Sequence, residues 1–161
     1  MHRIQELGLP DTARMLVLNN DHARETSLLD EPGMAGLLNQ AFYCRGIDCG
    51  AAAFLIALDQ DALYDNPNFD WFTQRYESFV YIDRIIVAGA ARGKGLARLL
   101  YEDLFASAWQ AGHSRVVCEV NSDPPNPASD AFHDAMGFHA VGQAILYGGA
   151  KKVRYFEKIP I

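Results

Sequence analysis

The segment from Phe79 to Ala111 limits the fold of this chain more than any other part of the sequence. Phe79–Val87 is rich in β-branched and aromatic residues, which predicts a strand. After a turn at Ala88–Ala91, apolar residues recur with a period of about 3.6, which predicts an amphipathic helix over Gly95–Ala111 that Gly112 ends. The apolar face of that helix consists of Leu96, Leu99, Leu100, Leu104, Ala108 and Ala111. This strand and helix begin the order strand, helix, strand, helix, strand, strand, which is an α/β pattern.

The rest of the chain supplies further strands and helices around this unit. Asp30–Gly33 is typical of a helix start, with apolar residues at helical spacing behind it. Thr12–Leu18 and Ala51–Leu58 are each compatible with a helix or a strand, and Asn19–Asp21 predicts a turn after the first of them. The other expected elements are a strand at 42–44, an excursion at 59–78 that is partly helical at 71–76, a strand at 115–120, a loop at 121–128, a helix at 129–136, and strands at 138–146 and 153–158 joined by Gly148-Gly149. This order predicts one mixed sheet with flanking helices, in the α/β (α+β) class.

Length and charge exclude several classes of function. At 161 residues, the chain is expected to form a single domain over residues 1–161. Its formal net charge of −6 argues against a general nucleic-acid binder. No apolar run approaches the roughly 20 residues of a membrane span, and the N-terminal residues lack the apolar core of a secretory signal. The three cysteines form no C-x-x-C pair, so we expect a cytoplasmic protein with no disulfide framework, no metal, and no nucleic-acid or membrane partner.

The turn Arg92-Gly93-Lys94-Gly95-Leu96-Ala97 has the composition of a phosphate-binding turn. Its two glycines allow a tight turn whose N–H groups no Cβ shields. The first turn of the following helix adds unpaired N–H donors and the positive end of the helix dipole. Arg92, Lys94 and Arg98 add positive charge. A plain solvent-exposed turn accounts for the same residues equally well, and the Gly-Lys-Ser/Thr ending of a P-loop is missing.

Two blocks of the sequence resemble the GNAT superfamily of N-acetyltransferases. Arg92, Gly95 and Ala97 fit its signature Arg/Gln-x-x-Gly-x-Gly/Ala, and Ile85-Ile86-Val87 looks like part of its fourth strand. Residues 126–138, Asn-Pro-Ala-Ser-Asp-Ala-Phe-His-Asp-Ala-Met-Gly-Phe, resemble its second block. The resemblance implies a mixed, mostly antiparallel central sheet flanked by helices. In such a sheet, the fourth and fifth strands splay apart to admit the pantetheine arm of acetyl-CoA.

The resemblance, which runs from about Tyr81 to Phe138, also implies a function. The chain is expected to transfer an acetyl group from acetyl-CoA to a primary amine by direct attack in a ternary complex, while a backbone N–H near Val87 polarises the thioester. A non-catalytic acyl-CoA-binding or regulatory module with the same fold is the alternative. A generic nucleotide-phosphate binder is disfavoured, because it would not need the second block. The implied acetyl-CoA-binding residues are Ile85, Ile86, Val87, Arg92, Gly93, Lys94, Gly95, Leu96, Ala97, Arg98, Asn126, Ser129 and Phe132.

The second block holds two side chains whose roles the sequence leaves open. His133 stands where the family often has a tyrosine that protonates the leaving thiolate, and an imidazole could take over that role. It could equally hydrogen-bond the pantetheine or a neighbouring backbone group. Asn126 resembles the family asparagine that binds the pantetheine amide, although an Asn-Pro pair also serves as a helix cap or turn.

Two carboxylates are candidates for the base that deprotonates the amine. Glu119 points away from its two neighbours in the strand, and some family members carry a glutamate there. A solvent-facing or salt-bridged role is the equal alternative. Asp83 is the competitor, and alternation places it on the same face as Ile85 and Val87. An ion pair with Arg84 is the simpler interpretation of Asp83.

The acceptor is a small-molecule or peptide amine that the sequence does not identify. Tyr64, Trp71 and Tyr76 in the 59–78 excursion suit an apolar amine, whereas several aspartates there suit a cationic one. A homodimer is compatible with such a fold, and no residue pattern decides the oligomeric state.

Overall fold

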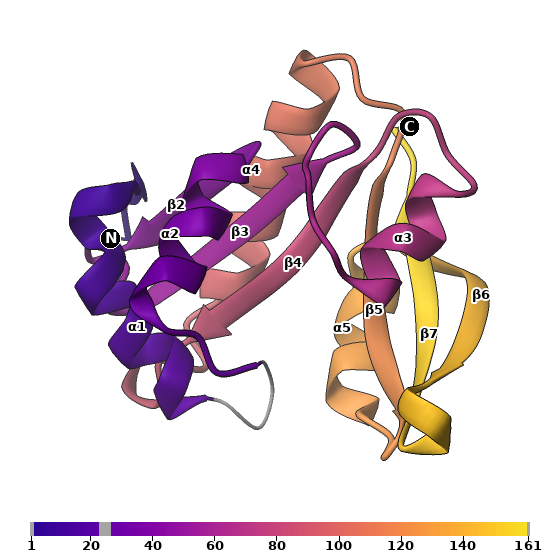
Figure 1. Cartoon of the computed structure of the whole chain (residues 1–161). Coiled ribbons are helices and arrows are strands. Elements are labelled where there is room, and N and C mark those ends of the chain that lie inside the picture. Colours follow the sequence, from indigo (N-terminus) through magenta and orange to yellow (C-terminus); the bar gives the residue numbers. More distant parts are fainter. Residues whose placement is uncertain (1, 23–26, 161) are drawn as a thin grey trace.

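One mixed seven-stranded sheet organises the protein, whose computed structural model describes residues 2–22 and 27–160. The strand order is β1-β2-β3-β4-β5-β7-β6, and every neighbouring pair is antiparallel except β4 and β5, which are parallel (Figure 1). The strands are β1 (Ile4–Glu6), β2 (Tyr43–Ile47), β3 (Ala53–Asp59), β4 (Val80–Val87), β5 (Val116–Asp123), β6 (His139–Leu146) and β7 (Lys151–Lys158). The expected fold class, a mostly antiparallel sheet flanked by helices, is confirmed.

Helices cover both faces of the sheet. In Figure 1, α1, α2 and α3 lie on the near face, and α4 and α5 lie behind it. The helices are α1 (Thr12–Asp21), α2 (Glu31–Gln40), α3 (Pro67–Thr73), α4 (Leu96–Gln110) and α5 (Pro127–Ala135), with short 3₁₀ turns at Leu9–Asp11, Gly89–Ala91 and Tyr147–Gly149. Apolar side chains of α4 pack on β2 to β5, whereas α1, α2 and α3 form separate clusters on the other face. The core therefore lies in two layers, one on each side of the sheet.

The structure resolves both ambiguous apolar segments. Thr12–Leu18 is helical, and residues 53–58 of the second segment belong to the buried central strand β3. The predicted turn at Asn19–Asp21 is wrong, because α1 continues to Asp21. Asn19 is fully buried and donates a hydrogen bond to the Ser27 carbonyl, so it serves packing between segments and not a turn.

The predicted loop at 121–128 is also mostly wrong. Strand β5 continues to Asp123 because its residues pair with β7. Helix α5 already begins at Pro127, a position where a helix tolerates proline because its first N–H groups have no intrahelical partner. Strand β1 was not predicted, because its three residues are too few to show a period. Helix α3 begins at Pro67 and not near residue 71, because Asn66 caps it.

The sheet divides between β4 and β5. The two strands pair only at Val80↔Val116 and Tyr81↔Val117, and then separate, so that the sheet opens into a V in Figure 1. Each strand keeps its other neighbour over its length, β3 for β4 and β7 for β5. The expected splaying of the fourth and fifth strands is confirmed.

A bulge in β4 lies where the strands separate. Ile56 of β3 pairs with Arg84 and Ala57 pairs with Ile82, so Asp83 is the extra residue of the bulge. The bulge interrupts the alternation of side chains on which the placement of Asp83 rested. Ile85 packs towards the α4 side of the sheet, whereas Asp83 contacts residues on the α1 side.

Helix α3 is fixed to the C-terminal half of the sheet by Trp71. The indole ring stacks on Tyr155 of β7 at 4.2 Å between ring centroids, and Arg75 lies over its other face. Gly142 of β6 lies directly against the ring, which would collide with a Cβ at that position. The position of α3 therefore depends on the absence of a side chain at Gly142.

We predict that Gly142→Ala destabilises the protein by about 1–3 kcal/mol, because the added methyl group displaces the Trp71 ring. Gly36→Ala is the matched control, since a Cβ at this exposed position of α2 meets no atom within 4 Å. In a helix interior it should stabilise by about 0.5–1 kcal/mol. Urea unfolding followed by circular dichroism measures both changes, and equal effects of the two substitutions would contradict this account of Gly142.

Candidate active site

The separation of β4 from β5 creates a cavity of about 260 Å³ on the α4 and α5 side of the sheet. Its walls come from β4, β5, α4, α5 and the start of β7. A second cavity, of about 190 Å³, lies between β4, β5, α3 and the segment after α1. Six of the predicted site residues line the first cavity: Asp83, Ile85, Glu119, Asn126, Ser129 and His133. Since both cavities are lined by Asp83, Arg84, Glu119, Asn121 and Lys151, they meet across the opened sheet.

The glycine turn has the open geometry expected of a phosphate site. Gly93 and Gly95 have φ values of 77° and 73°, which L side chains rarely adopt, and a Cβ at either would meet no atom within 4 Å. Gly95 is the N-cap of α4, and no side chain caps this helix end. The N–H groups of the first turn are therefore free to bind an external anion.

The basic residues of the turn lie at the surface. Arg92 and Lys94 are exposed, and Arg98 forms an exposed ion pair with Glu102 at 3.0 Å. The side chain of Leu96 is buried in the core beneath α4, so only its backbone can contribute to binding. Ala97 is half-buried in the same helical turn.

The predicted β4 residues divide between the two faces of the sheet. Ile86 is buried against α1 and α2. Ile85 and Val87 are half-buried and pack on the α4 side, and Ile85 lines the larger cavity. Beyond Tyr81, β4 has no pairing with β5, so its edge faces the opening.

Asn126 is confirmed as the cap of α5. Its side-chain oxygen accepts a hydrogen bond from the Ser129 N–H at 3.2 Å. Both residues also line the larger cavity, so the cap does not remove Asn126 from the site. Phe132 is half-buried and packs edge-on against Tyr101, and its ring supports the cavity wall from behind.

His133 is buried in the wall of the larger cavity with both ring nitrogens bonded. Nδ1 lies 2.7 Å from the Ser129 carbonyl, which can only accept, so Nδ1 carries a hydrogen. In the neutral ring, Nε2 then accepts from the Tyr101 hydroxyl at 2.9 Å. Burial lowers the pKa of His133 from its ordinary value, which favours this neutral form at pH 7. The backbone hydrogen bond considered from the sequence is therefore present.

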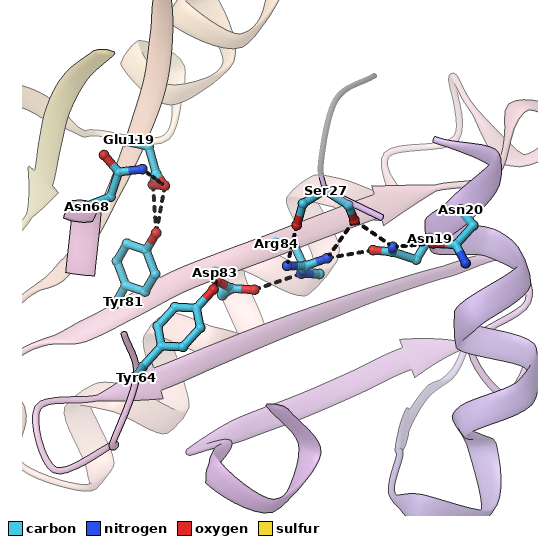
Figure 2. Close-up of polar contacts among 9 residues, drawn as sticks. All are labelled: Asn19, Asn20, Ser27, Tyr64, Asn68, Tyr81, Asp83, Arg84 and Glu119. Carbon is cyan, nitrogen blue, oxygen red and sulfur yellow. Dashed lines mark hydrogen bonds and ion pairs between the residues drawn. The ribbon is translucent and has the colours of Figure 1, made fainter. Parts of the chain in front are cut away.

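Glu119 is the one candidate carboxylate that hydrogen bonds hold without a cation. Figure 2 shows its oxygens accepting from the Tyr81 hydroxyl, at 2.6 and 3.1 Å, and from the Asn68 amide at 3.0 Å. Tyr155 fixes Asn68 by donating to its carbonyl oxygen at 2.9 Å. Burial raises the pKa of Glu119 to about 7, with a contribution from the nearby charge of Asp83, although the bond from Tyr81 acts in the opposite direction. A carboxylate with this pKa can exchange a proton near neutral pH.

Asp83 is held in an ion pair, as its simpler interpretation proposed. Its carboxylate accepts from Arg84 Nε at 2.7 Å and from the Tyr64 hydroxyl at 2.6 Å. The Arg84 guanidinium also binds the Asn19 side chain at 2.8 Å and the Ser27 carbonyl and hydroxyl oxygens at 3.3 Å (Figure 2). This buried network joins β4 to the segment between α1 and α2.

Several site residues have no sequence signal. Tyr101 is hidden within the apolar face of α4, and Tyr81 within the apolar pattern of β4. Asn68 lies in the 59–78 excursion, where only the aromatic residues and the aspartates were considered as contacts for the acceptor. Of those aromatic residues only Tyr64 lines a cavity next to Glu119, whereas Trp71 and Tyr76 lie against Arg75 and Arg115.

Within residues 2–22 and 27–160, no cluster of three or more His, Cys, Asp or Glu side chains could hold a metal ion. In the same residues, no helix is long and apolar enough to cross a membrane.

Solved structures of acetyltransferases resemble nearly the whole chain. The ribosomal-protein-alanine N-acetyltransferase of Brucella melitensis superposes with a TM-score of 0.74 at 20% identity, covering 98% of this chain and 99% of its own. NAA60 of Arabidopsis thaliana, solved with a bisubstrate analogue, gives 0.74 at 14% identity and covers 99% and 98%. Ard1 of Thermoplasma volcanium gives 0.76 at 13% identity and covers 99% and 98%. At these identities the likeness shows the fold.

Sequence comparison identifies the family. No curated protein sequence matches the chain. The model of the acetyltransferase (GNAT) family, however, matches residues 50–138, which are more than half of the chain and include the glycine turn and most of the cavity walls. The resemblance seen in the sequence is thus confirmed, and the chain belongs to the acetyltransferase (GNAT) family.

Proposed function

We propose that this protein is an N-acetyltransferase that transfers the acetyl group of acetyl-CoA to a primary amine by direct attack in a ternary complex. The observation that carries the proposal is the pair of cavities that meet between β4 and β5. The larger cavity lies on the side of the sheet covered by α4 and α5, and the smaller one lies on the other side, with Glu119 in both. A donor and an acceptor entering from opposite sides would meet at the edge of β4.

The α4 side fits acetyl-CoA. The uncapped N-terminus of α4 and the glycine turn offer N–H donors to a pyrophosphate, and Arg92 and Lys94 add exposed positive charge. The free edge of β4 and the side chain of Asn126 are placed to bind the amides of a pantetheine arm. NAA60 of Arabidopsis thaliana, which has the same fold, has been solved with acetyl-CoA.

Glu119 is proposed as the base that takes a proton from the amine. Its pKa of about 7 allows it to be ionised at neutral pH and still to bind a proton from an ammonium group. Tyr81 and Asn68 orient its carboxylate towards the cavities. The ion pair with Arg84 makes Asp83 a poorer base, because protonating Asp83 would leave a buried guanidinium without its counter-charge.

The leaving thiolate is proposed to be protonated at the wall formed by His133 and Tyr101. These two groups share one hydrogen bond in the larger cavity, and in the neutral pair the proton lies on the Tyr101 hydroxyl. In this neutral pair Nε2 of His133 carries no hydrogen, so we assign the proton that the thiolate receives to the Tyr101 hydroxyl, and His133, the donor expected from the sequence, positions that hydroxyl.

Release of CoA thiol in the presence of an amine panel tests the function. The panel holds small primary amines, amino acids and a short peptide beginning with alanine, since one structural neighbour is named as acting on ribosomal-protein alanine. Turnover that falls in both His133→Phe and Glu119→Gln supports the proposal. Tight binding of acetyl-CoA without turnover on any amine would instead indicate the non-catalytic acyl-CoA-binding module.

We predict that Gly95→Glu abolishes binding of acetyl-CoA, because it places a carboxylate at the N-terminus of α4 where the pyrophosphate would lie. In wild type, acetyl-CoA at about 100 times its Kd should raise the Tm by roughly 5–10 °C. That shift should disappear in the variant, as measured by differential scanning fluorimetry.

Gly112→Glu is the matched control for Gly95→Glu. Gly112 follows the other end of α4, has a φ of 87°, and also has open space around its missing Cβ. Both substitutions impose the same kind of backbone strain and add the same charge, but only Gly95 lies in the glycine turn where the pyrophosphate is proposed to bind. If acetyl-CoA still raised the Tm of Gly95→Glu, the assignment of the turn as the pyrophosphate site would be contradicted.

The raised pKa of Glu119 predicts a pH profile. The carboxylate must be ionised to accept a proton, so kcat/KM should fall as the pH drops through about 7. Glu119→Gln should lower kcat about 100-fold and should abolish this fall of kcat/KM at low pH. Both enzymes are measured with the same acceptor, so that the ionisation of the acceptor affects them equally.

Glu77→Gln provides the control for that profile. Glu77 is exposed in the segment before β4 and lies outside both cavities, so its substitution should leave the profile unchanged. If the fall of kcat/KM near pH 7 survived in Glu119→Gln, the base would be another group, and Asp83 would be the next candidate.

A further inference from the structure

The smaller cavity contains a cation, Lys151, that pairs with no acid among the residues that the structure describes. Lys151, at the start of β7, lines both cavities beside Glu119. Among residues 2–22 and 27–160, its ammonium group forms no ion pair or hydrogen bond. The neighbouring cation, Arg84, is in the opposite state, because Asp83, Asn19 and Ser27 occupy its donors.

The other charges around Lys151 do not satisfy it. Asp83 is engaged with Arg84 and Tyr64. Glu119 is held by Tyr81 and Asn68, and although the charge of Lys151 lowers the pKa of Glu119, the two groups form no ion pair. Lys151 therefore keeps its three N–H donors available to a bound molecule.

A second free polar group lies on the same side of the sheet. Asn121 is two residues after Glu119 in β5, so the two side chains share a face of the strand. Asn121 lines both cavities and its amide forms no hydrogen bond with any described residue. The smaller cavity thus combines a carboxylate suited to an amine with an ammonium and an amide suited to an anion.

We propose that the acceptor is a small primary amine that also carries an anionic group, such as the carboxylate of an amino acid, and that Lys151 binds this group while Glu119 faces the amine. The inference rests on the proposed function and specifies its acceptor. A cavity of about 190 Å³ suits a molecule of this size. A cationic polyamine would place a second ammonium group beside Lys151, which like-charge repulsion disfavours.

Matched acceptors isolate the role of the anion. Each free L-amino acid is compared with its carboxamide, which has nearly the same shape, lacks the charge, and resembles the N-terminus of a peptide. In wild type, kcat/KM should be at least about tenfold higher for the acid of the preferred pair, the effect of one charge-assisted hydrogen bond. Lys151→Met should remove this preference, mainly by raising KM for the acid.

Lys152→Met is the control variant. Lys152 is the next residue of β7, so its side chain points to the opposite face, and it lines a different depression with Gln143 and Ile145. It should keep the preference for the acid. Because Lys151 also lowers the pKa of Glu119, its removal can change the rate with both members of a pair, but only loss of anion recognition changes the ratio between them.

The outcomes separate the two proposals. If wild type acetylates no amine, the proposed function fails. If wild type is active but uses carboxamides or peptides as well as it uses free acids, or if the acid preference survives in Lys151→Met, the inference about the acceptor is overturned and the proposed function stands.

Discussion

The separation of β4 from β5 is the constraint on which the rest of the site depends. Two strands that pair at only two positions leave a row of unpaired backbone groups in the middle of the sheet, which would be costly if they were buried without partners. The cost is contained because β3 and β7 hold the outer edges of the two strands. The opening is therefore a stable feature of the sheet, and a ligand with its own amide groups can complete the missing pairing from the α4 side.

The surroundings of the opening also explain why we propose Glu119, and not Asp83, as the base. The bulge at Asp83 turns that side chain towards Arg84, so the charge closest to the opening on β4 is neutralised within the protein. Glu119 on β5 accepts hydrogen bonds only from neutral donors, Tyr81 and Asn68. The bond from Tyr81 lowers the pKa of Glu119, but by less than burial raises it. The two acids on facing strands thus differ in their partners, because Asp83 forms an ion pair with Arg84, whereas Glu119 forms no ion pair with any described residue and burial raises its pKa.

How much of this could be predicted depends on the range of the interactions. Alternation within β5 placed Glu119 correctly, since Cys118 and Val120 do pack in the core and Glu119 faces the other side. The same rule failed at Asp83, because a bulge depends on the register with β3 and leaves no mark in the local pattern. The glycine turn and the second block were visible because their chemistry lies in consecutive residues. The raised pKa of Glu119 was not visible, because the burial that raises it is produced by segments that lie far apart in the sequence.

The same reasoning explains why the acceptor side was the least visible part of the sequence. The wall of the smaller cavity combines residues of β4, β5, α3 and the start of β7 with Ser27. These segments lie far apart in the sequence and come together only in the folded protein. The aromatic residues that suggested an apolar amine are mostly used to fix α3 to the sheet. The charged side chains that remain at the cavity differ in their pairing: Arg84 forms an ion pair with Asp83, whereas Lys151 has no partner among residues 2–22 and 27–160. A molecule that bears both charges would complement Lys151 and Glu119, and this complementarity would bring the proposed acceptor to the same opening of the sheet as the proposed donor.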